Sequence, residues 1–219
     1  MGANWVVVPI YNEARFISRF LDRLLVQTDK IIVVDDGSTD KSKAIVTSKG
    51  VICLSHLVNL GKGAAIKTGC EFAFKKRKAH AVIIMDGDDQ HDPQDLKAFT
   101  RELNKGAEIV LGVRALDANM PLMRVLGNKT MSFIVGLIFR HYFTDIPSGF
   151  KAMTRHAYHL VKWSSLGYEV ETEIAVRIAK QGLSYVEIPI TTIYHGKDYG
   201  FNLLDAGKIL LKLPYWLWR

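Results

Sequence analysis

One stretch of the sequence decides the fold: Ala81-Val82-Ile83-Ile84-Met85-Asp86-Gly87-Asp88-Asp89-Gln90-His91-Asp92-Pro93. Its first four residues form an apolar, largely β-branched run that is typical of a buried parallel strand. Asp92 and Pro93 are typical of a helix N-cap and of the first residue of a helix. Asp86 and Asp88 therefore follow the end of a strand, where ligands bind in open α/β sheets.

The spacing of Asp86 and Asp88 indicates a metal site. Two carboxylates at positions i and i+2 of a loop can share one hard divalent cation, and Mg²⁺ and Mn²⁺ prefer oxygen ligands together with substrate phosphates. We therefore expect Mg²⁺ or Mn²⁺ as the cofactor. The alternative for this motif taken alone is a polar turn that only caps the following helix.

Apolar runs and helical patterns alternate over the first 113 residues. Strands are predicted at residues 5–10, 31–34, 51–54, 81–85 and 109–113, and helices at residues 14–26, 42–49, 62–76 and 94–104. Short apolar runs separated by helical segments indicate βαβ crossovers. The predicted fold class is α/β, with a mostly parallel central sheet flanked by helices.

The composition is that of an ordinary globular protein. The chain has 219 residues, of which 23% are charged and 48% hydrophobic, so one domain with a full core is the simplest organisation. Cys53 and Cys70 lie in apolar surroundings and are expected to be small core residues in a reducing compartment. Met1-Gly2-Ala3-Asn4 leads directly into a strand, so we expect no signal peptide. The net charge of +7 suits anionic partners.

Two segments in the second half of the chain, residues 120–143 and 201–219, combine apolar residues with Lys, Arg, Trp or Tyr. Neither offers the roughly 20 uninterrupted apolar residues that a membrane-spanning helix needs. They are predicted to form amphipathic helices that lie at the interface of a bilayer, with Trp216, Leu217 and Trp218 inserted. The alternative is a pair of buried core helices or a dimer face.

Polar residues and glycines follow each of the five predicted strands. In a mostly parallel sheet these strand ends meet at one rim, where ligands bind. Carboxylates there can accept hydrogen bonds from base and ribose groups, and Gly61 and Gly63 let the backbone approach a ligand closely. The strand ends are Pro9-Ile10-Tyr11-Asn12-Glu13, Asp35-Asp36, Asn59-Leu60-Gly61-Lys62-Gly63, Asp86-Gly87-Asp88 and Gly112-Val113-Arg114.

Several motifs carry a resemblance to a known family. The set formed by Val7-Val8-Pro9-Ile10-Tyr11-Asn12-Glu13, Asp35-Asp36-Gly37-Ser38-Thr39-Asp40, Asn59-Leu60-Gly61-Lys62-Gly63 and the stretch from Asp86 to Pro93 resembles family 2 glycosyltransferases with the A-type nucleotide-sugar fold. Asp145-Ile146-Pro147-Ser148-Gly149-Phe150-Lys151 and Glu171-Thr172-Glu173 resemble its dolichyl-phosphate mannose and glucose synthase branch.

The resemblance implies an inverting, metal-dependent hexosyltransferase. In that branch a sugar passes from GDP-mannose or UDP-glucose to a dolichyl or polyprenyl phosphate. Residues 1–115 would form the nucleotide-sugar-binding half of one domain, and residues 116–219 the acceptor-binding half. The enzyme would act peripherally at the cytoplasmic face of a membrane, with a membrane protein as a further partner and with no nucleic acid.

The resemblance also assigns roles to individual residues. Asp86, Asp88 and Gln90 are expected to hold the metal, and Asp88 and Arg114 to be catalytic. Arg114, Lys151 and Lys197 are expected to bind the acceptor phosphate, although His195-Gly196-Lys197-Asp198-Tyr199-Gly200 departs from the Gly-x-Ser-Lys element that family members often carry. The expected nucleotide-sugar-binding residues are Pro9, Tyr11, Asn12, Glu13, Asp35, Asp36, Lys62, Asp86 and Asp88.

The acceptor is inferred from the chemistry of these residues. A phosphate monoester has a second pKa near about 6, so it needs charge screening more than a general base. Arg114, Lys151 and Lys197 supply positive charge. No convincing base accompanies them, because Glu173 is expected to support a helix N-terminus and Glu171 is ambiguous. The alternatives are a glycosyltransferase that acts on a glycan or protein hydroxyl, and a nucleotide-sugar-binding module without turnover.

Overall fold

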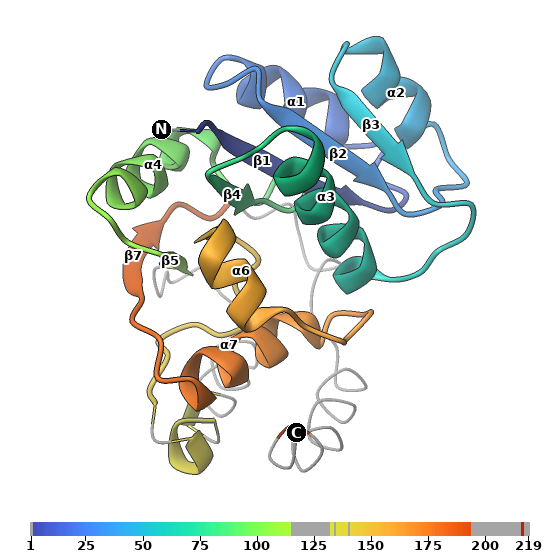
Figure 1. Cartoon of the computed structure of the whole chain (residues 1–219). Coiled ribbons are helices and arrows are strands. Elements are labelled where there is room, and N and C mark those ends of the chain that lie inside the picture. The colour runs from blue at the N-terminus through green and yellow to red at the C-terminus, as the bar shows by residue number, and fades with distance from the viewer. Residues whose placement is uncertain (1, 115–131, 134, 140, 194–215, 217–219) are drawn as a thin grey trace.

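The computed structural model describes residues 2–114, 132–133, 135–139, 141–193 and 216. In this part of the chain, one seven-stranded sheet in the order β3-β2-β1-β4-β6-β5-β7 is flanked by helices (Figure 1). This arrangement confirms the predicted α/β fold class. Among the described residues there is no helix with the length and apolar character required to cross a bilayer.

Over the first 114 residues the strands and helices alternate as predicted, whereas two helices follow each other between β6 and β7. The strands are β1 (Asn4–Ile10), β2 (Ile31–Asp35), β3 (Ile52–Ser55), β4 (Ala81–Ile84), β5 (Ile109–Arg114), β6 (Lys151–Thr154) and β7 (Val186–Ile190). The helices are α1 (Ile17–Leu25), α2 (Ser42–Ser48), α3 (Lys62–Lys76), the 3-10 turn η1 (Pro93–Asp95), α4 (Leu96–Asn104), α6 (Arg155–Val161) and α7 (Val170–Lys180).

The boundaries of the nine elements predicted in the first 113 residues need only small corrections. The helix predicted over residues 62–76 has those bounds. The helix predicted from residue 14 begins at Ile17, after a turn in which Phe16 and Ile17 donate to the carbonyl of Glu13. The helix predicted from residue 94 begins with the 3-10 turn η1. Asp92 is its N-cap, as predicted, and accepts a hydrogen bond from the Gln94 N–H at 3.0 Å.

One strand runs against the others and explains how the second half of the chain reaches the rim. β6 pairs antiparallel with both β4 and β5, whereas β1, β2, β3 and β4 pair in parallel, as do β5 and β7. The first residue of β6, Lys151, lies opposite Ile84 of β4 and Leu111 of β5. Because β6 starts where its neighbours end, the loop before it enters the rim at the carboxyl ends of the parallel strands.

Two hydrophobic clusters cover the two faces of the sheet. One packs α3, α6 and α7 against the sheet and includes Phe74, Tyr158 and Trp163. The other packs α1 and α4 against the opposite face and includes Phe20 and Phe99. Strands with both faces covered have continuous apolar sequences, which is why the sequence predicts them. Cys70 is buried in the first cluster and Cys53 is half-buried, and both are free thiols.

Candidate functional site

The loops at the carboxyl ends of β1, β2, β3 and β4 surround a cavity of about 430 Å³. It lies at the rim predicted from the sequence, and the loop before α7 closes it from the other side with Gly167 and Tyr168. Most of the residues expected to bind the nucleotide sugar line its wall. These are Pro9, Tyr11, Glu13, Asp36, Lys62, Asp86 and Asp88.

The acidic loop after β4 is anchored from behind by helix α1. Asp89 is fully buried, with a left-handed φ of 59°, and its carboxylate accepts hydrogen bonds from Arg19 Nε at 2.7 Å and Arg23 Nη1 at 2.8 Å. Arg23 also pairs with Asp92. The loop is therefore fastened on both sides of Gln90, whose N–H donates to Asp88 Oδ1 at 3.0 Å.

The anchoring by α1 is not among the sequence predictions, although the sequence holds a signal for it. Arg19 and Arg23 are four residues apart in the predicted helix and so lie on one face of it. The acidic stretch supplies a third carboxylate, Asp89, to which the motifs assign no role. Like charges at i and i+4 of a helix repel each other, and the carboxylate of Asp89 between them offsets this repulsion.

Asp86 belongs to a chain of alternating charges that begins at the cavity wall. Its Oδ1 lies 2.7 Å from the ammonium of Lys62, and the same ammonium lies 3.1 Å from Glu171 Oε1. Glu171 in turn pairs with Lys151. Burial by itself would lower the pKa of Lys62, but Asp86 and Glu171 outweigh it and hold that pKa above its usual range. The interaction with Lys62 correspondingly lowers the pKa of Asp86 against the effect of burial.

The approach of the loop before β6 requires a glycine beside Asp86. A Cβ atom at Gly149 would lie 2.2 Å from Asp86 Oδ2, which is far closer than van der Waals contact. On the other side, the backbone N–H of Asp86 lies 3.3 Å from Nδ1 of His91. Burial lowers the pKa of His91 to about 4, so this imidazole is neutral at physiological pH. Asp86 is therefore held by neighbours on several sides.

Glu13 places a further carboxyl group in the cavity, in addition to those of Asp36, Asp86 and Asp88. Burial, followed by the charges of Asp88 and Asp86, raises its pKa to about 8. Its Oε2 atom is buried and has no hydrogen-bond partner among the described residues. A buried polar atom without a partner is uncommon in folded proteins, so this oxygen is well suited to contact a ligand.

The oxygen donors at this site fit Mg²⁺ or Mn²⁺ shared with a substrate. Within the described ranges no group of three or more His, Cys, Asp or Glu side chains is arranged to hold a metal ion without help. Asp86 and Asp88 offer two hard carboxylates on the cavity wall. Magnesium is commonly bound by one or two carboxylates together with phosphate oxygens and water, so this set suits a metal that arrives with a diphosphate.

Three of the expected nucleotide-binding residues hold loops together. Asn12 adopts a left-handed φ of 57°, and its Oδ1 accepts from the Thr39 N–H at 2.9 Å. Asp35 accepts from the Ser38 N–H at 3.2 Å. Neither of the two lines the cavity.

Asp36, the third, lines the cavity and also fixes the loop after β3. Its carboxylate accepts from the N–H groups of Leu60 at 3.0 Å and Gly61 at 2.7 Å. The same carboxylate lies 2.6 Å from His56 Nδ1, and His56 Nε2 lies 2.9 Å from the hydroxyl of Thr68. The entrance to the cavity is thus tied to the end of β2.

The described residues expected to bind the acceptor phosphate already have carboxylate partners. Arg114 donates through Nε and Nη2 to the two oxygens of Asp145 at 2.8 and 2.7 Å, and Lys151 pairs with Glu171. Neither residue lines the cavity, and Gln90 does not line it either. The sequence does not predict Asp145 as a partner because it follows Arg114 by 31 residues. Lys197 lies outside the described residues.

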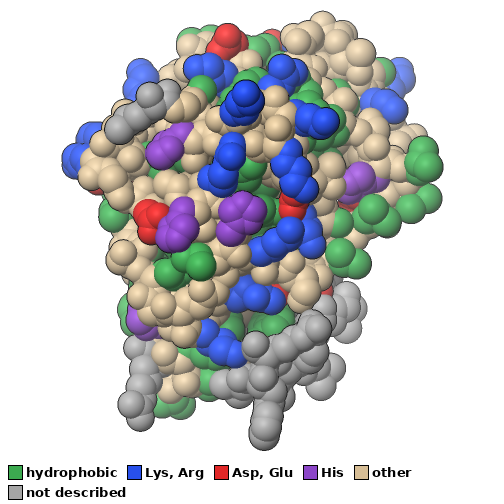
Figure 2. Space-filling view, in the orientation of Figure 1, with side chains coloured by type: hydrophobic (Ala, Val, Ile, Leu, Met, Phe, Trp, Pro, Cys, Tyr) green, Lys and Arg blue, Asp and Glu red, His purple; other side chains and the backbone are tan. Residues whose placement is uncertain are grey.

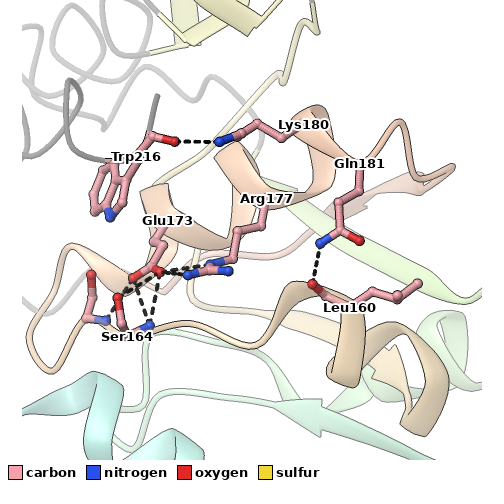
Figure 3. Close-up of polar contacts among 8 residues, drawn as sticks. Leu160, Ser164, Glu173, Arg177, Lys180, Gln181 and Trp216 are labelled. Carbon is pink, nitrogen blue, oxygen red and sulfur yellow. Dashed lines mark hydrogen bonds and ion pairs between the residues drawn. The ribbon is translucent and has the colours of Figure 1, made fainter. Parts of the chain in front are cut away.

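Glu173 supports the loop that closes the cavity, as Figure 3 shows for its contacts with Ser164 and Arg177. Its carboxylate accepts from the N–H groups of Ser164 at 3.0 Å and Ser165 at 2.7 Å, and from Arg177 Nε at 2.8 Å. Its place in the first turn of α7 agrees with the role predicted near a helix N-terminus. The side chain has no free oxygen to act as a base.

The predicted interfacial segments are only partly described. Within residues 120–143, Phe133 and Leu137 are exposed while Val135 is buried, so apolar side chains lie on both the exposed and the buried side of this segment. The expectation that Trp216 inserts into a bilayer is wrong. Its side chain is buried in the cluster with α7, and its carbonyl accepts from Lys180 at 2.9 Å (Figure 3). Leu217 and Trp218 lie outside the described residues.

Comparisons with known proteins agree with this geometry. Residues 5–159 match the protein family described as Glycosyl transferase family 2. An uncharacterized protein of Methanocaldococcus jannaschii is 36% identical over 221 residues, which cover 95% of this chain and 90% of that protein. The UDP-N-acetylglucosamine–dolichyl-phosphate N-acetylglucosaminyltransferase of Methanococcus voltae is 30% identical over 236 residues, which cover 95% of this chain and 94% of that enzyme.

A solved structure shares the fold. Glucosyl-3-phosphoglycerate synthase from Mycobacterium tuberculosis, in complex with Mn²⁺, uridine diphosphate and phosphoglyceric acid, has a TM-score of 0.74 and 18% sequence identity. The match covers 99% of this chain and 77% of that chain. This likeness confirms the predicted architecture.

Proposed function

Because the chain belongs to glycosyl transferase family 2, we propose that it transfers a sugar from a nucleotide-diphosphate donor to a polyprenyl or dolichyl phosphate at a membrane surface. The observation that carries the proposal is the cavity at the rim, whose wall brings together the carboxyl groups of Asp86, Asp88 and Glu13. The relative from Methanococcus voltae, named for transfer to dolichyl phosphate, supports the acceptor class.

The cavity suits the donor. Its volume of about 430 Å³ lies within the range of small-molecule sites, and it combines apolar walls with a few polar groups. Pro9 and Tyr11 offer apolar and aromatic surface to a base, and Asp36 and Glu13 offer carboxyl groups to base and ribose. Glu13, with its raised pKa, can donate as well as accept a hydrogen bond.

The diphosphate belongs at the acidic end of the same cavity. Asp86 and Asp88 would hold Mg²⁺ or Mn²⁺ together with the donor diphosphate, and the metal would neutralise the negative charge that develops on the leaving group. Lys62 adds a second positive charge 2.7 Å from Asp86. Arg19 and Arg23 fix Asp89 and so hold the loop that presents Asp88.

The surroundings of Glu171 favour a phosphate acceptor over a hydroxyl. A hydroxyl acceptor needs a general base within hydrogen-bond reach to take its proton, and Glu171 and Glu173 are the candidates in the second half of the chain. The two oxygens of Glu171 face Lys62 and Lys151, and Glu171 does not line the cavity. Both carboxylate oxygens of Glu173 already accept hydrogen bonds from Ser164, Ser165 or Arg177. A lipid phosphate is already ionised and needs no such base.

A direct assay tests this function. The full chain is incubated with Mg²⁺ or Mn²⁺, a panel of GDP- and UDP-sugars, and either polyprenyl phosphate or the matching polyprenol. We expect transfer to the phosphate alone, with one donor clearly preferred. Equal transfer to the polyprenol would favour the hydroxyl-acceptor alternative and make Glu171 the candidate base. Binding of a donor without transfer to any acceptor would favour a non-catalytic module.

A further inference from the structure

Large apolar side chains are exposed around the entrance of the cavity. They come from the loop after β3 and the loop before α7. Leu57 is 101% exposed, and the other four are between 47% and 62% exposed. In Figure 2 hydrophobic side chains protrude at the right edge of the molecule, where Figure 1 draws the loop that follows β3. We call this set the apolar mouth: Leu57, Val58, Leu60, Leu166 and Tyr168.

The apolar mouth is a fixed surface built from two loops that touch. The carbonyl of Leu166 accepts from the Ala64 N–H at 3.2 Å, and a Cβ atom at Gly61 would lie 2.4 Å from that carbonyl oxygen. Asp36 ties Leu60 and Gly61 to β2, and Glu173 ties the segment before Leu166 to α7. These contacts hold the backbone of both loops at Leu60 and Leu166, and an exposed apolar patch marks an interaction site.

The position of the apolar mouth points to its partner. Asn59, Gly61, Gly167 and Tyr168 line the cavity, so the neighbouring apolar side chains stand at its entrance. A lipid phosphate has to reach the cavity while its hydrocarbon chain stays in an apolar medium. The basic charge of the protein adds attraction to an anionic bilayer, and Figure 2 shows Lys and Arg side chains over the face formed by α3 and α6.

We infer that the apolar mouth inserts to headgroup depth in the bilayer that carries the acceptor, so that the cavity opens onto the membrane. The inference rests on the proposed function and adds to it the face that meets the lipid. This surface is distinct from the predicted interfacial segments at residues 120–143 and 201–219. A protein partner on the same surface is the competing occupant, and vesicle binding separates the two.

The test uses a double variant of the full chain, Leu57→Ser with Val58→Ser. Neither residue lines the cavity, and both side chains lie mostly in solvent, so the fold and the donor site stay intact. The matched control is Val26→Ser, an 81% exposed apolar residue at the end of α1. Each protein is tested for co-sedimentation with vesicles of phosphatidylcholine and phosphatidylglycerol. Sugar transfer is then measured with a long-chain polyprenyl phosphate in those vesicles and with a short, water-soluble isoprenyl phosphate.

We expect the double variant to lose at least tenfold in vesicle binding and in transfer to the vesicle-borne acceptor, with unchanged transfer to the soluble acceptor. The control should match the wild type throughout. Wild-type behaviour of the double variant with vesicles would overturn the inference and favour a protein partner on this surface. An equal loss with both acceptors would also overturn it, because the loops would then act on the donor site. If the wild type glycosylates neither phosphate, the proposed function fails, while the co-sedimentation result still decides the membrane contact.

Discussion

Arg23 binds the carboxylate of Asp89 at 2.8 Å and thereby joins helix α1 to the loop that presents Asp88 to the cavity. Asp89 is fully buried, whereas the side chain of Arg23 is about a third exposed. The pair is therefore more than a salt bridge on the surface, because it holds the bend of the backbone at Asp89. The position of Asp88 depends on a residue that does not itself line the cavity.

Replacement of Asp89 is expected to loosen that bend. Asp89→Ala removes the partner of two arginines and places Ala at a φ of 59°, which Asn and Asp tolerate better than Ala does. Because both arginines can turn toward solvent, we expect a loss of about 2 kcal/mol in the free energy of unfolding. Asp89→Asn, which tolerates the same φ, should lose less. Denaturant titration of both variants measures this. An unchanged midpoint for Asp89→Ala would show that α1 does not hold the loop.

Asp88 is expected to matter for turnover and not for folding. Asp88→Ala truncates a carboxylate on the cavity wall and opens no core cavity. The loss of a metal ligand should lower kcat by about a hundredfold or more, since metal stabilisation of the leaving group contributes several kcal/mol. Initial rates at saturating donor, together with a thermal melt, make the comparison. Near wild-type turnover would contradict the assignment of Asp88 to the metal.

The raised pKa of Glu13 predicts a pH-dependent stability. Between its ordinary pKa of 4.5 and the folded value of about 8, the folded chain keeps a proton that the unfolded chain releases. Stability therefore falls as the pH rises through this window. A glutamine at this position carries no charge at any pH. The free energy of unfolding of Glu13→Gln, relative to that of the wild type, should therefore rise by about 1 kcal/mol between about pH 5 and about pH 8.5, because partial exposure to water weakens the effect. Parallel stability curves for the two proteins would contradict this.

The glycine beside Asp86 is expected to be irreplaceable. Gly149→Ala would place a Cβ atom 2.2 Å from Asp86 Oδ2, and Asp86 cannot turn away without leaving Lys62. We expect a loss of about 2 kcal/mol in stability and a fall in activity that exceeds it. Gly136→Ala is the control, because a Cβ atom there would lie no closer than 3.4 Å to the surrounding heavy atoms. Full activity of Gly149→Ala would mean that the loop before β6 does not approach Asp86 this closely.

The first half of the fold could be predicted because its signals are local. The central strands β1, β2 and β4 are apolar runs whose residues are mostly buried, and Asp92 with Pro93 marks the start of the turn η1. The convergence of Asp86, Lys62 and Pro9 on one cavity follows from the parallel arrangement. These features require no knowledge of which distant residues meet.

The second half could not be predicted in the same way because its interactions are distant in sequence. Nothing in Lys151-Ala152-Met153-Thr154 indicates that this short strand enters between β4 and β5 in the opposite direction. The pairing of Arg114 with Asp145 depends on that arrangement. The basic and aromatic character around Trp216 predicts a membrane contact, but its side chain is buried in the cluster that contains residues of α7, and a sequence pattern does not distinguish these two apolar environments.

The antiparallel strand β6 also sets the order in which a growing chain completes this enzyme. β4 is synthesised early, yet its partner on one side begins only at Lys151. Until then β4 has an unpaired edge, to which a strand from another nascent chain can add. The wall formed by Gly167 and Tyr168 emerges later still. A ribosome-bound chain therefore carries Asp86 and Asp88 well before it can close a cavity around a donor, and we expect a prematurely terminated chain to aggregate through the open edge of β4.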